Sequence, residues 1–432
     1  MVASRAAYGY IEPAGDGTLI PGCRLIDANV YRKGIRESEL VPLIRDIVER
    51  YHDICKIYNI CINIPTRKVG RPSPLSVAID ELHRSFDVTF VSSSGNVLDY
   101  IDKGSLEDVL NDDTYWLQIP AQSVYALTVG AIAHREEYGS LSGINQVVPY
   151  SRHGPGISNT VKPDLLAYSA NVDYYDGKKT YLYDDMSKVL SDDGPVHMPG
   201  TSFSAPVVSN HLAQVMDRFK GLRSRACCAL MINGCEPVSH KGTSRNRVGF
   251  GSATLEGCLD QFPWRTTFIR EAEIGKDGNK VHLIRFPVPE CLEGRDCTIT
   301  VTCLSDPELN ASQNQSYIQS NLSVTMQKME HDGKYPKGEN VKEREKLSTE
   351  KDPCQMKIYK ISGMDTKELR LRIASTVNPI AESSEVQYTL IVTIEEDSRS
   401  VDVYEAVRGM NHYRAVSEVL KERISDQQTV TS

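Results

Sequence analysis

The chain has 432 residues, of which 40% are hydrophobic and 25% are charged, and its formal net charge at pH 7 is −8. This length allows two or three domains with sizeable cores, and the acidic balance argues against a nucleic acid or an anionic membrane as the partner. No apolar run approaches the length that spans a bilayer, so no membrane span is predicted.

The first part of the chain, up to about residue 260, alternates strand-like and helix-like patterns. Ser38 is the expected cap of the first helix, and Pro74 opens the second, because proline at the first helical position needs no N–H. The predicted strands cover residues 24–31, 60–64, 88–91 and 124–132, and the predicted helices cover residues 40–58 and the segment that begins at Ser73. Strand, helix and strand at this spacing predict an α/β fold with a parallel sheet flanked by helices. Ligands of such sheets bind beyond the carboxyl ends of the strands, and Asn96 lies at one such end.

Residues 200–206 read Gly-Thr-Ser-Phe-Ser-Ala-Pro and stand before an apolar run. This pattern predicts a helix with Ser202 on its first turn, where backbone N–H groups favour developing negative charge. An ordinary Thr or Ser cap is the alternative, because both residues are common at helix N-termini. The blocks of sequence around this segment favour the reactive serine.

Several further blocks accompany the serine segment. They are Phe-Val-Ser-Ser-Ser-Gly-Asn at 90–96, Ile-Pro-Ala at 119–121 with Ala-Leu-Thr-Val-Gly-Ala at 126–131, Pro-Tyr-Ser-Arg-His-Gly-Pro at 149–155, Val-Lys-Pro-Asp-Leu at 161–165 and Val-Gly-Phe-Gly at 248–251. In this order the blocks resemble the second half of a subtilisin-like serine peptidase, a member of the subtilase family, over about residues 1–260. The resemblance implies a subtilisin-like parallel sheet flanked by helices and a serine-type endopeptidase that hydrolyses peptide bonds.

The resemblance also implies roles for individual residues. Ser202 would be the nucleophile that attacks the scissile carbonyl, and Asn96 would donate its side-chain amide to the oxyanion, together with the backbone N–H of Ser202. The alternative for Asn96 is a turn residue chosen for its tolerance of positive φ. The matching positions of the substrate groove, which would receive a protein or peptide substrate, are Pro120, Ala121, Gly200 and Thr201.

The same resemblance indicates what this sequence lacks. In the family the general base lies in a His-Gly-Thr segment that opens a helix, and an aspartate lies earlier. Residues 1–9 resemble the continuation of that segment from its fourth position, so the histidine would fall three residues before Met1. We therefore expect the catalytic Asp and His to lie upstream of Met1 and the sheet to lack its first part. Residues 1–432 alone should have almost no peptidase activity. A genuine start in an alanine-rich helix is the alternative.

A histidine within the chain would have to replace the missing base. The candidates are His134, His153 and His197. We do not expect such a substitution, because a base must reach hydrogen-bond distance in the correct orientation.

Two functions of different class remain. The first is a serine endopeptidase, and the second is a non-catalytic subtilase-like module that binds peptides or a partner protein. Retention of Ser202 and Asn96 favours the peptidase, because a module without catalysis has no chemical reason to keep both residues.

Beyond about residue 262, short β-rich runs predict an antiparallel β-sandwich over residues 262–400. Its strands are expected at residues 281–286, 297–303, 322–326, 356–361, 369–373 and 388–394. Residues 401–432 are predicted to form a C-terminal helix, over residues 403–424, and a polar tail. The predicted domains are therefore residues 1–260, 262–400 and 401–432.

Residues 171–193 are rich in Asp and Tyr and are predicted to be a solvated loop, because they lack the ligand spacing of a calcium loop. The alternative is that their acidic side chains bind Ca²⁺ or the basic side chains of a substrate. Neither a metal nor another cofactor is predicted. The 11 cysteines are odd in number and lack paired Cys-x-x-Cys motifs, which predicts reduced thiols. Reduced thiols favour a compartment such as the cytoplasm, but the compartment stays open because any leader would lie upstream of Met1.

Overall fold

The computed structural model describes residues 1–12, 15–30, 32, 34–65, 71–97, 115–175, 178–238, 244–259, 262–275, 281–312, 317–330, 332–336, 341–349, 352–378, 381, 385–408 and 410. The chain divides into two compact units. The first unit comprises Met1–Asp217, Cys235–Thr254 and Ala311–Tyr317, and the second comprises Arg218–Gly234, Leu255–Asn310 and Ile318–Ser432. The predicted domain boundaries near residues 260 and 400 stay a prediction.

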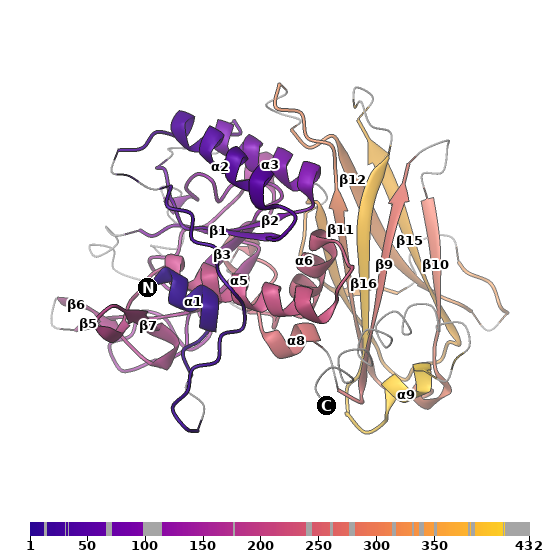
Figure 1. Cartoon of the computed structure of the whole chain (residues 1–432). Helices are drawn as coiled ribbons and strands as arrows, with labels where there is room; N and C mark the ends of the chain where they lie inside the picture. Colours follow the sequence, from indigo (N-terminus) through magenta and orange to yellow (C-terminus); the bar gives the residue numbers. More distant parts are fainter. Residues whose placement is uncertain are drawn as a thin grey trace, which may run out of the picture. The chain divides into compact units, whose positions relative to one another are not determined.

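The first unit contains a parallel sheet of four strands in the order β1-β2-β3-β4 (Figure 1). The strands are β1 (Ile57–Ile60), β2 (Thr89–Ser93), β3 (Leu127–Ala133) and β4 (Leu165–Ser169). Every residue of β2 and β3 is buried, as expected for the inner strands of a parallel sheet. The predicted α/β fold with a parallel sheet flanked by helices is confirmed.

Helices of the first unit cover and extend this sheet. They are α1 (Val2–Tyr8), α2 (Glu37–Tyr51), α3 (Pro74–Phe86), α5 (Thr201–Arg218, whose last residue falls in the second unit) and α7 (Arg245–Val248), with the 3₁₀ turns η2 (Ile157–Asn159) and η3 (Asp185–Ser187). The start of α3 is as predicted, because Ser73 Oγ accepts the Ser76 N–H at 3.1 Å and Pro74 follows the cap. Apolar side chains of α2 and α3 pack with β1 and β2 in one cluster that includes Leu40, Ile79 and Phe90.

The limits of α2 differ from the prediction. Its cap is Arg36 and not Ser38, because the Glu39 carboxylate accepts the Arg36 N–H at 3.0 Å and stabilises an earlier start. The helix ends at Tyr51, seven residues before the predicted end, since β1 already begins at Ile57. The strand predicted at residues 60–64 therefore lies too far along the chain.

The strand predicted at residues 24–31 is wrong over its described part. Residues 24–30 have no regular secondary structure, and Leu25 and Ile26 are 46% and 48% exposed. Alternating apolar side chains do not by themselves produce a strand, because the backbone N–H and C=O groups also need hydrogen-bond partners on a neighbouring strand. Here β1 is the last strand at its edge of the sheet, and none of its ladder partners comes from residues 24–30.

The solvated loop predicted at residues 171–193 is also wrong, because two hairpins form there. They are β5 (Asn171–Tyr175) with β6 (Lys178–Leu182), and β7 (Lys188–Ser191) with β8 (Gly194–His197). Val172 and Val189 are fully buried, so each hairpin has an apolar anchor that the acidic composition obscured. Gly194 has φ 115°, which suits the tight turn of the second hairpin.

The second unit is built from two antiparallel sheets, in the orders β10-β15-β12 and β13-β14-β11-β16-β9. The strands are β9 (Arg265–Ile274), β10 (Val281–Pro287), β11 (Cys297–Asp306), β12 (Ser320–Lys328), β13 (Glu343–Lys346), β14 (Cys354–Ile361), β15 (Glu368–Val377) and β16 (Val386–Glu396). All six predicted strands of this region are present. The prediction missed β9 and β13, whose charged residues weaken the apolar alternation.

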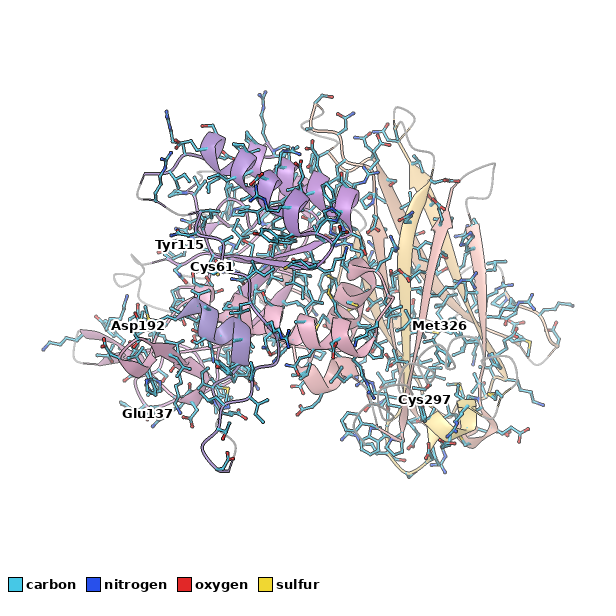
Figure 2. All side chains as sticks on the ribbon, in the orientation of Figure 1. Cys61, Tyr115, Glu137, Asp192, Cys297 and Met326 are labelled. Atoms are coloured by element: carbon cyan, nitrogen blue, oxygen red, sulfur yellow. The ribbon has the colours of Figure 1, made fainter. Side chains whose placement is uncertain are left out.

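Among the described residues of the second unit, a large apolar cluster contains side chains from both sheets. Cys297 and Met326, both labelled in Figure 2, belong to it. Helices α6 (Ser224–Asn233), α8 (Leu255–Leu259) and α9 (Val403–Arg408) and the 3₁₀ turn η4 (Glu290–Leu292) complete the described elements of this unit. The part of the predicted C-terminal helix and tail at residues 411–432 lies outside the described residues.

Within the described part of the chain, no helix combines the length and the apolar character that crossing a membrane requires. The same residues contain no group of three or more His, Cys, Asp or Glu side chains suited to a metal ion. The cysteines form no disulfide.

Candidate active site

Ser202 is the second residue of α5, as the sequence predicts. The turn into the helix depends on Gly200, whose φ of 133° is rarely adopted by residues with a side chain. The Phe203 N–H donates to the Gly200 carbonyl at 2.9 Å and closes the first turn. Ser202 is partly exposed at this position, whereas Gly200 and Thr201 are buried.

Pro206 disturbs the first turns of α5. Proline has no N–H, so the Ser202 carbonyl loses the donor that a helix normally provides four residues later. The Cys61 thiol, which follows β1 and is labelled in Figure 2, lies 3.5 Å from this carbonyl oxygen and donates to it. Burial raises the pKa of Cys61 to about 11, so the thiol keeps its proton at neutral pH.

Asn96 contacts the start of the same helix. Its Oδ1 accepts the Thr201 N–H at 3.0 Å and the Thr201 hydroxyl at 3.2 Å. A backbone N–H can only donate, so the oxygen of the Asn96 amide must face Thr201 and the nitrogen must face away. A Cβ added to Gly200 would lie 3.4 Å from Asn96 Nδ2, which puts this nitrogen next to the turn before Ser202.

Arg152 holds Asn96 from the other side. Its Nε donates to the Asn96 carbonyl at 3.1 Å, and its NH1 donates to the Trp116 carbonyl at 3.0 Å. Gly95 leaves room for this arrangement, because a Cβ there would lie 2.9 Å from both Arg152 Cδ and Gln118 Oε1. The arginine of the 149–155 block is therefore a structural group that fixes the backbone of Asn96.

Pro120 and Ala121 are buried inside the first unit. The residue before them, Ile119, exchanges backbone hydrogen bonds of 2.8 and 3.0 Å with Ile64. The Ala121 carbonyl accepts the Thr128 hydroxyl at 2.5 Å. These two residues thus support the Ile64–Ile119 pair from behind, and their hydrogen bonds do not reach the start of α5.

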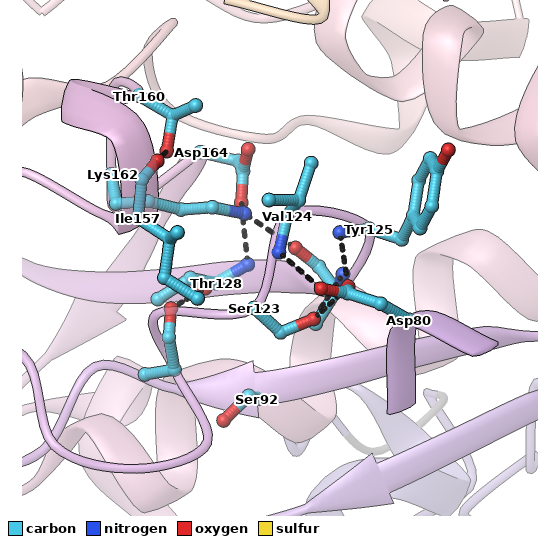
Figure 3. A network of polar contacts seen from close by, with 12 residues as sticks. Asp80, Ser92, Ser123, Val124, Tyr125, Thr128, Ile157, Thr160, Lys162 and Asp164 are labelled. Carbon is cyan, nitrogen blue, oxygen red and sulfur yellow. Dashed lines mark hydrogen bonds and ion pairs between the residues drawn. The ribbon is translucent and has the colours of Figure 1, made fainter. Parts of the chain in front are cut away.

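The other blocks of the resemblance also form structural contacts. The Lys162 ammonium is 1% exposed and donates to the Ala126 carbonyl and to Asp164 Oδ2, both at 2.6 Å (Figure 3). The same Asp164 oxygen accepts the Thr128 N–H at 2.7 Å. These bonds join β3 and β4 beside the segment that contains Pro120 and Ala121.

The three candidate bases have other partners. Within the described residues, His134 Nδ1 lies 3.0 Å from Asp184 Oδ2, His153 Nδ1 lies 2.8 Å from the Gly154 carbonyl, and His197 Nδ1 lies 3.0 Å from Ser187 Oγ. In the same part of the chain the Ser202 hydroxyl makes no hydrogen bond. A serine hydroxyl without a base is a poor nucleophile, so the described geometry holds a nucleophile candidate and amide donors but no base.

Arg5 is a buried residue near the site that sequence reasoning missed. Its guanidinium donates to the Phe203 carbonyl at 3.3 Å, in the first turn of α5, and to the Met186 carbonyl in η3. Burial lowers the pKa of Arg5 to about 10, and burial together with the Arg5 charge lowers the pKa of His211 to about 4. An arginine between Ser4 and Ala6 reads as an exposed helical residue, and no local signal marks its distant partners.

The chain is similar to one protein family and to one individual protein of known sequence. The pattern of the subtilase family of peptidases matches residues 1–251. An uncharacterized protein of Sinorhizobium fredii, y4bN, is 25% identical over 304 residues, which cover 60% of this chain and 69% of that protein.

Solved structures with low similarity include two proteases. The prenylagaramide maturation protease PagA is 19% identical, with 60% of this chain and 79% of that chain covered and a TM-score of 0.38. MycP1 from the ESX-1 type VII secretion system is 22% identical, with 60% and 70% of the chains covered and a TM-score of 0.40.

Proposed function

The chain belongs to the subtilase family, and on that premise we propose that it is a serine-type endopeptidase in which Ser202 is the nucleophile and Asn96 stabilises the oxyanion. The observation that carries the proposal is the contact between Asn96 Oδ1 and the Thr201 N–H at 3.0 Å. Because this contact orients the amide, its NH2 group is free to donate at the start of the helix that carries Ser202.

In the proposed reaction the Ser202 hydroxyl attacks the scissile carbonyl of a protein or peptide and transfers its proton to a base. Asn96 Nδ2 and the Ser202 N–H donate to the oxyanion that forms. In subtilisin one such donor contributes roughly 3 kcal/mol to the stability of the transition state, and that figure is carried over here. Pro120, Ala121, Gly200 and Thr201 would shape the substrate groove from behind, since all four are buried.

The base and its orienting carboxylate are part of the proposal. The described residues offer Ser202 no base, and the resemblance expects a His-Gly-Thr segment and an aspartate upstream of Met1. Loss of the triad histidine costs subtilisin roughly a millionfold in turnover. We therefore expect the chain as printed to react slowly, and the chain with its upstream reading frame to react fast.

Labelling with a fluorophosphonate probe tests this proposal. The upstream nucleotide sequence is read first, and an in-frame His-Gly-Thr supports the proposal whereas an immediate stop codon contradicts it. In the extended protein Ser202→Ala should abolish labelling. Ser204→Ala is the matched control, because Ser204 is fully buried two residues further along α5 and its hydroxyl has no described partner. Rapid labelling of the printed chain that is lost on changing His134, His153 or His197 would reveal a substitute base.

A non-catalytic module that binds peptides is the second candidate. The observation that favours it is the Ser202 hydroxyl without a base among the described residues. This candidate predicts that the extended protein binds fluorescent peptides without cleaving them, and that Ser202→Ala leaves the affinity unchanged.

A further inference from the structure

A buried carboxylate in α3 has a role that the proposed chemistry does not use. Asp80 is 1% exposed, and it accepts hydrogen bonds from Ser123 Oγ at 2.5 Å, the Tyr125 N–H at 2.9 Å and the Val124 N–H at 3.3 Å (Figure 3). Its fourth donor is the Tyr317 hydroxyl at 2.9 Å. The carboxylate therefore holds three consecutive residues of one loop and one residue from far along the chain.

This arrangement is costly unless every donor is present. Burial raises the pKa of Asp80, because removal from water disfavours the charged form, and the hydrogen bonds oppose that effect. Tyr317 is itself 1% exposed, so its hydroxyl has been withdrawn from water to meet the carboxylate. Removing one partner of such a pair leaves the other buried without compensation.

The loop that Asp80 holds continues directly from the predicted substrate groove. Residues 123–125 follow Pro120 and Ala121, and Ile119 before them is paired with Ile64. Beyond the loop, the ion pair of Lys162 and Asp164 binds the Ala126 carbonyl and the Thr128 N–H. Two buried carboxylates thus hold the segment of residues 119–128, Asp80 at residues 123–125 and Asp164 at Thr128.

Tyr317 comes from outside the part of the chain that matches the family. The match ends at residue 251, and Tyr317 lies in the connection between β11 and β12. Residues Ala311–Tyr317 nevertheless belong to the first unit, while the chain on both sides of them belongs to the second. Leu309 and Ile318, on either side of this segment, form an isolated antiparallel β-bridge.

We infer that Asp80 and Tyr317 are positioning residues for the groove segment at residues 119–126, and that the C-terminal half of the chain thereby supplies a group on which the groove depends. That residues 119–126 line a substrate groove rests on the proposed function, whereas the fixed position of this segment does not. Neither residue touches the reacting atoms in this scheme. Their effect on substrate passes through the loop and the Ile64–Ile119 pair.

Hydrogen exchange of the full-length chain tests the positioning directly. Tyr317→Phe removes one hydroxyl and keeps the ring. We expect the Val124 and Tyr125 amides to exchange about tenfold faster or more, because a charged group loses a donor. Tyr138→Phe is the matched control, since Tyr138 is 99% exposed, and it should change nothing. Unchanged exchange at Val124 and Tyr125, or an equal increase across the first unit, would overturn the inference.

A second substitution keeps the test decisive if Tyr317→Phe alone does not fold. Asp80→Asn keeps the shape of the side chain but turns its NH2 group toward the Val124 or the Tyr125 N–H, so it should itself speed exchange at these amides, and adding Tyr317→Phe should produce no further increase. An additive effect would show that Tyr317 acts elsewhere.

Kinetics of the extended protein separate this inference from the proposed function. Tyr317→Phe should raise KM for a peptide about tenfold and change kcat by less than about twofold, because the loop positions substrate and not the nucleophile. Absence of any peptide hydrolysis in the extended wild type would defeat the proposed function, and the exchange result would still decide the positioning. An equal fall in kcat and kcat/KM would assign Tyr317 to the transition state and overturn the inference.

Discussion

The two units hold their interiors together in different ways. In the first unit the described apolar side chains form separate clusters, and between them lie buried charges such as Arg5, Asp80 and Lys162. In the second unit one described cluster joins the two sheets, and Arg225 and Glu396 are buried there as well. Apolar packing tolerates exchange of similar side chains, whereas a buried charge needs each of its partners in place. Changes at Arg5, Asp80 or Lys162 should therefore cost more than exchanges within the apolar cluster of the second unit, and these three residues lie in the unit that carries Ser202.

Two glycines with similar positive φ angles provide the strongest test of this difference. Gly249 in the first unit has φ 57° and Gly363 in the second has φ 59°. A Cβ at Gly249 would lie 2.3 Å from the Pro163 carbonyl oxygen, whereas a Cβ at Gly363 would meet nothing within 4 Å. Gly249→Ala should prevent folding of the first unit, and Gly363→Ala should cost only the strain of the left-handed backbone, about 1 kcal/mol. Urea unfolding measures both, and similar losses would show that close packing does not distinguish the units.

Substitution of Asn96 should have the next largest effect, which is on kcat and not on folding. Under the proposed function, Asn96→Ala in the extended protein should lower kcat about 100- to 1000-fold with little change in KM, because the proposed oxyanion exists only in the transition state. Asn96→Asp is the informative control. It keeps an oxygen to accept the Thr201 N–H but has no donor, so it should retain the stability of the helix start and lose turnover as the alanine variant does. Retained turnover in the aspartate variant would rule out oxyanion donation.

His211 should make the stability of the first unit depend on pH. Its pKa in the folded chain is about 4, against 6.5 for the free side chain, because burial and the nearby Arg5 charge disfavour the imidazolium. The unfolded state therefore takes up a proton first as the pH falls. The first unit should lose about 3 kcal/mol of stability between pH 6.5 and pH 4 from this residue and little more below pH 4.

Urea titrations at several pH values measure this loss. His211→Gln should flatten the dependence between pH 6.5 and pH 4. Leu25→Ser is the control, because Leu25 carries no titratable group and is 46% exposed. A wild-type slope that survives His211→Gln would assign the acid sensitivity to another group.

These differences also explain which features the sequence predicts. Strands of the second unit, such as β10 and β15, follow from alternating apolar residues, and Ser202 on the first turn of α5 follows from a local motif. Asp80 and Tyr317 could not be predicted, because they are 237 positions apart and each alone resembles an ordinary exposed residue. Local patterns reveal which face of an element is apolar. They do not reveal which distant group meets a buried charge.

The segment at residues 24–30 also shows that a local pattern does not reveal distant partners. Changes in it should have the smallest effect on the free energy of unfolding. Its apolar residues predict a strand, yet Leu25 and Ile26 are about half exposed, and Ile20 before them is 74% exposed. Replacing all three by Ser should change the free energy of unfolding by less than about 1.5 kcal/mol, or about 0.5 kcal/mol for each surface position. The same variant should bind less of a fluorescent hydrophobic dye and aggregate less, because exposed apolar side chains and the free edge of β1 promote association. If the serine variant instead lost several kcal/mol of stability, the segment would be packed as a strand in solution, and the first unit would contain an apolar layer of the kind that now distinguishes the second.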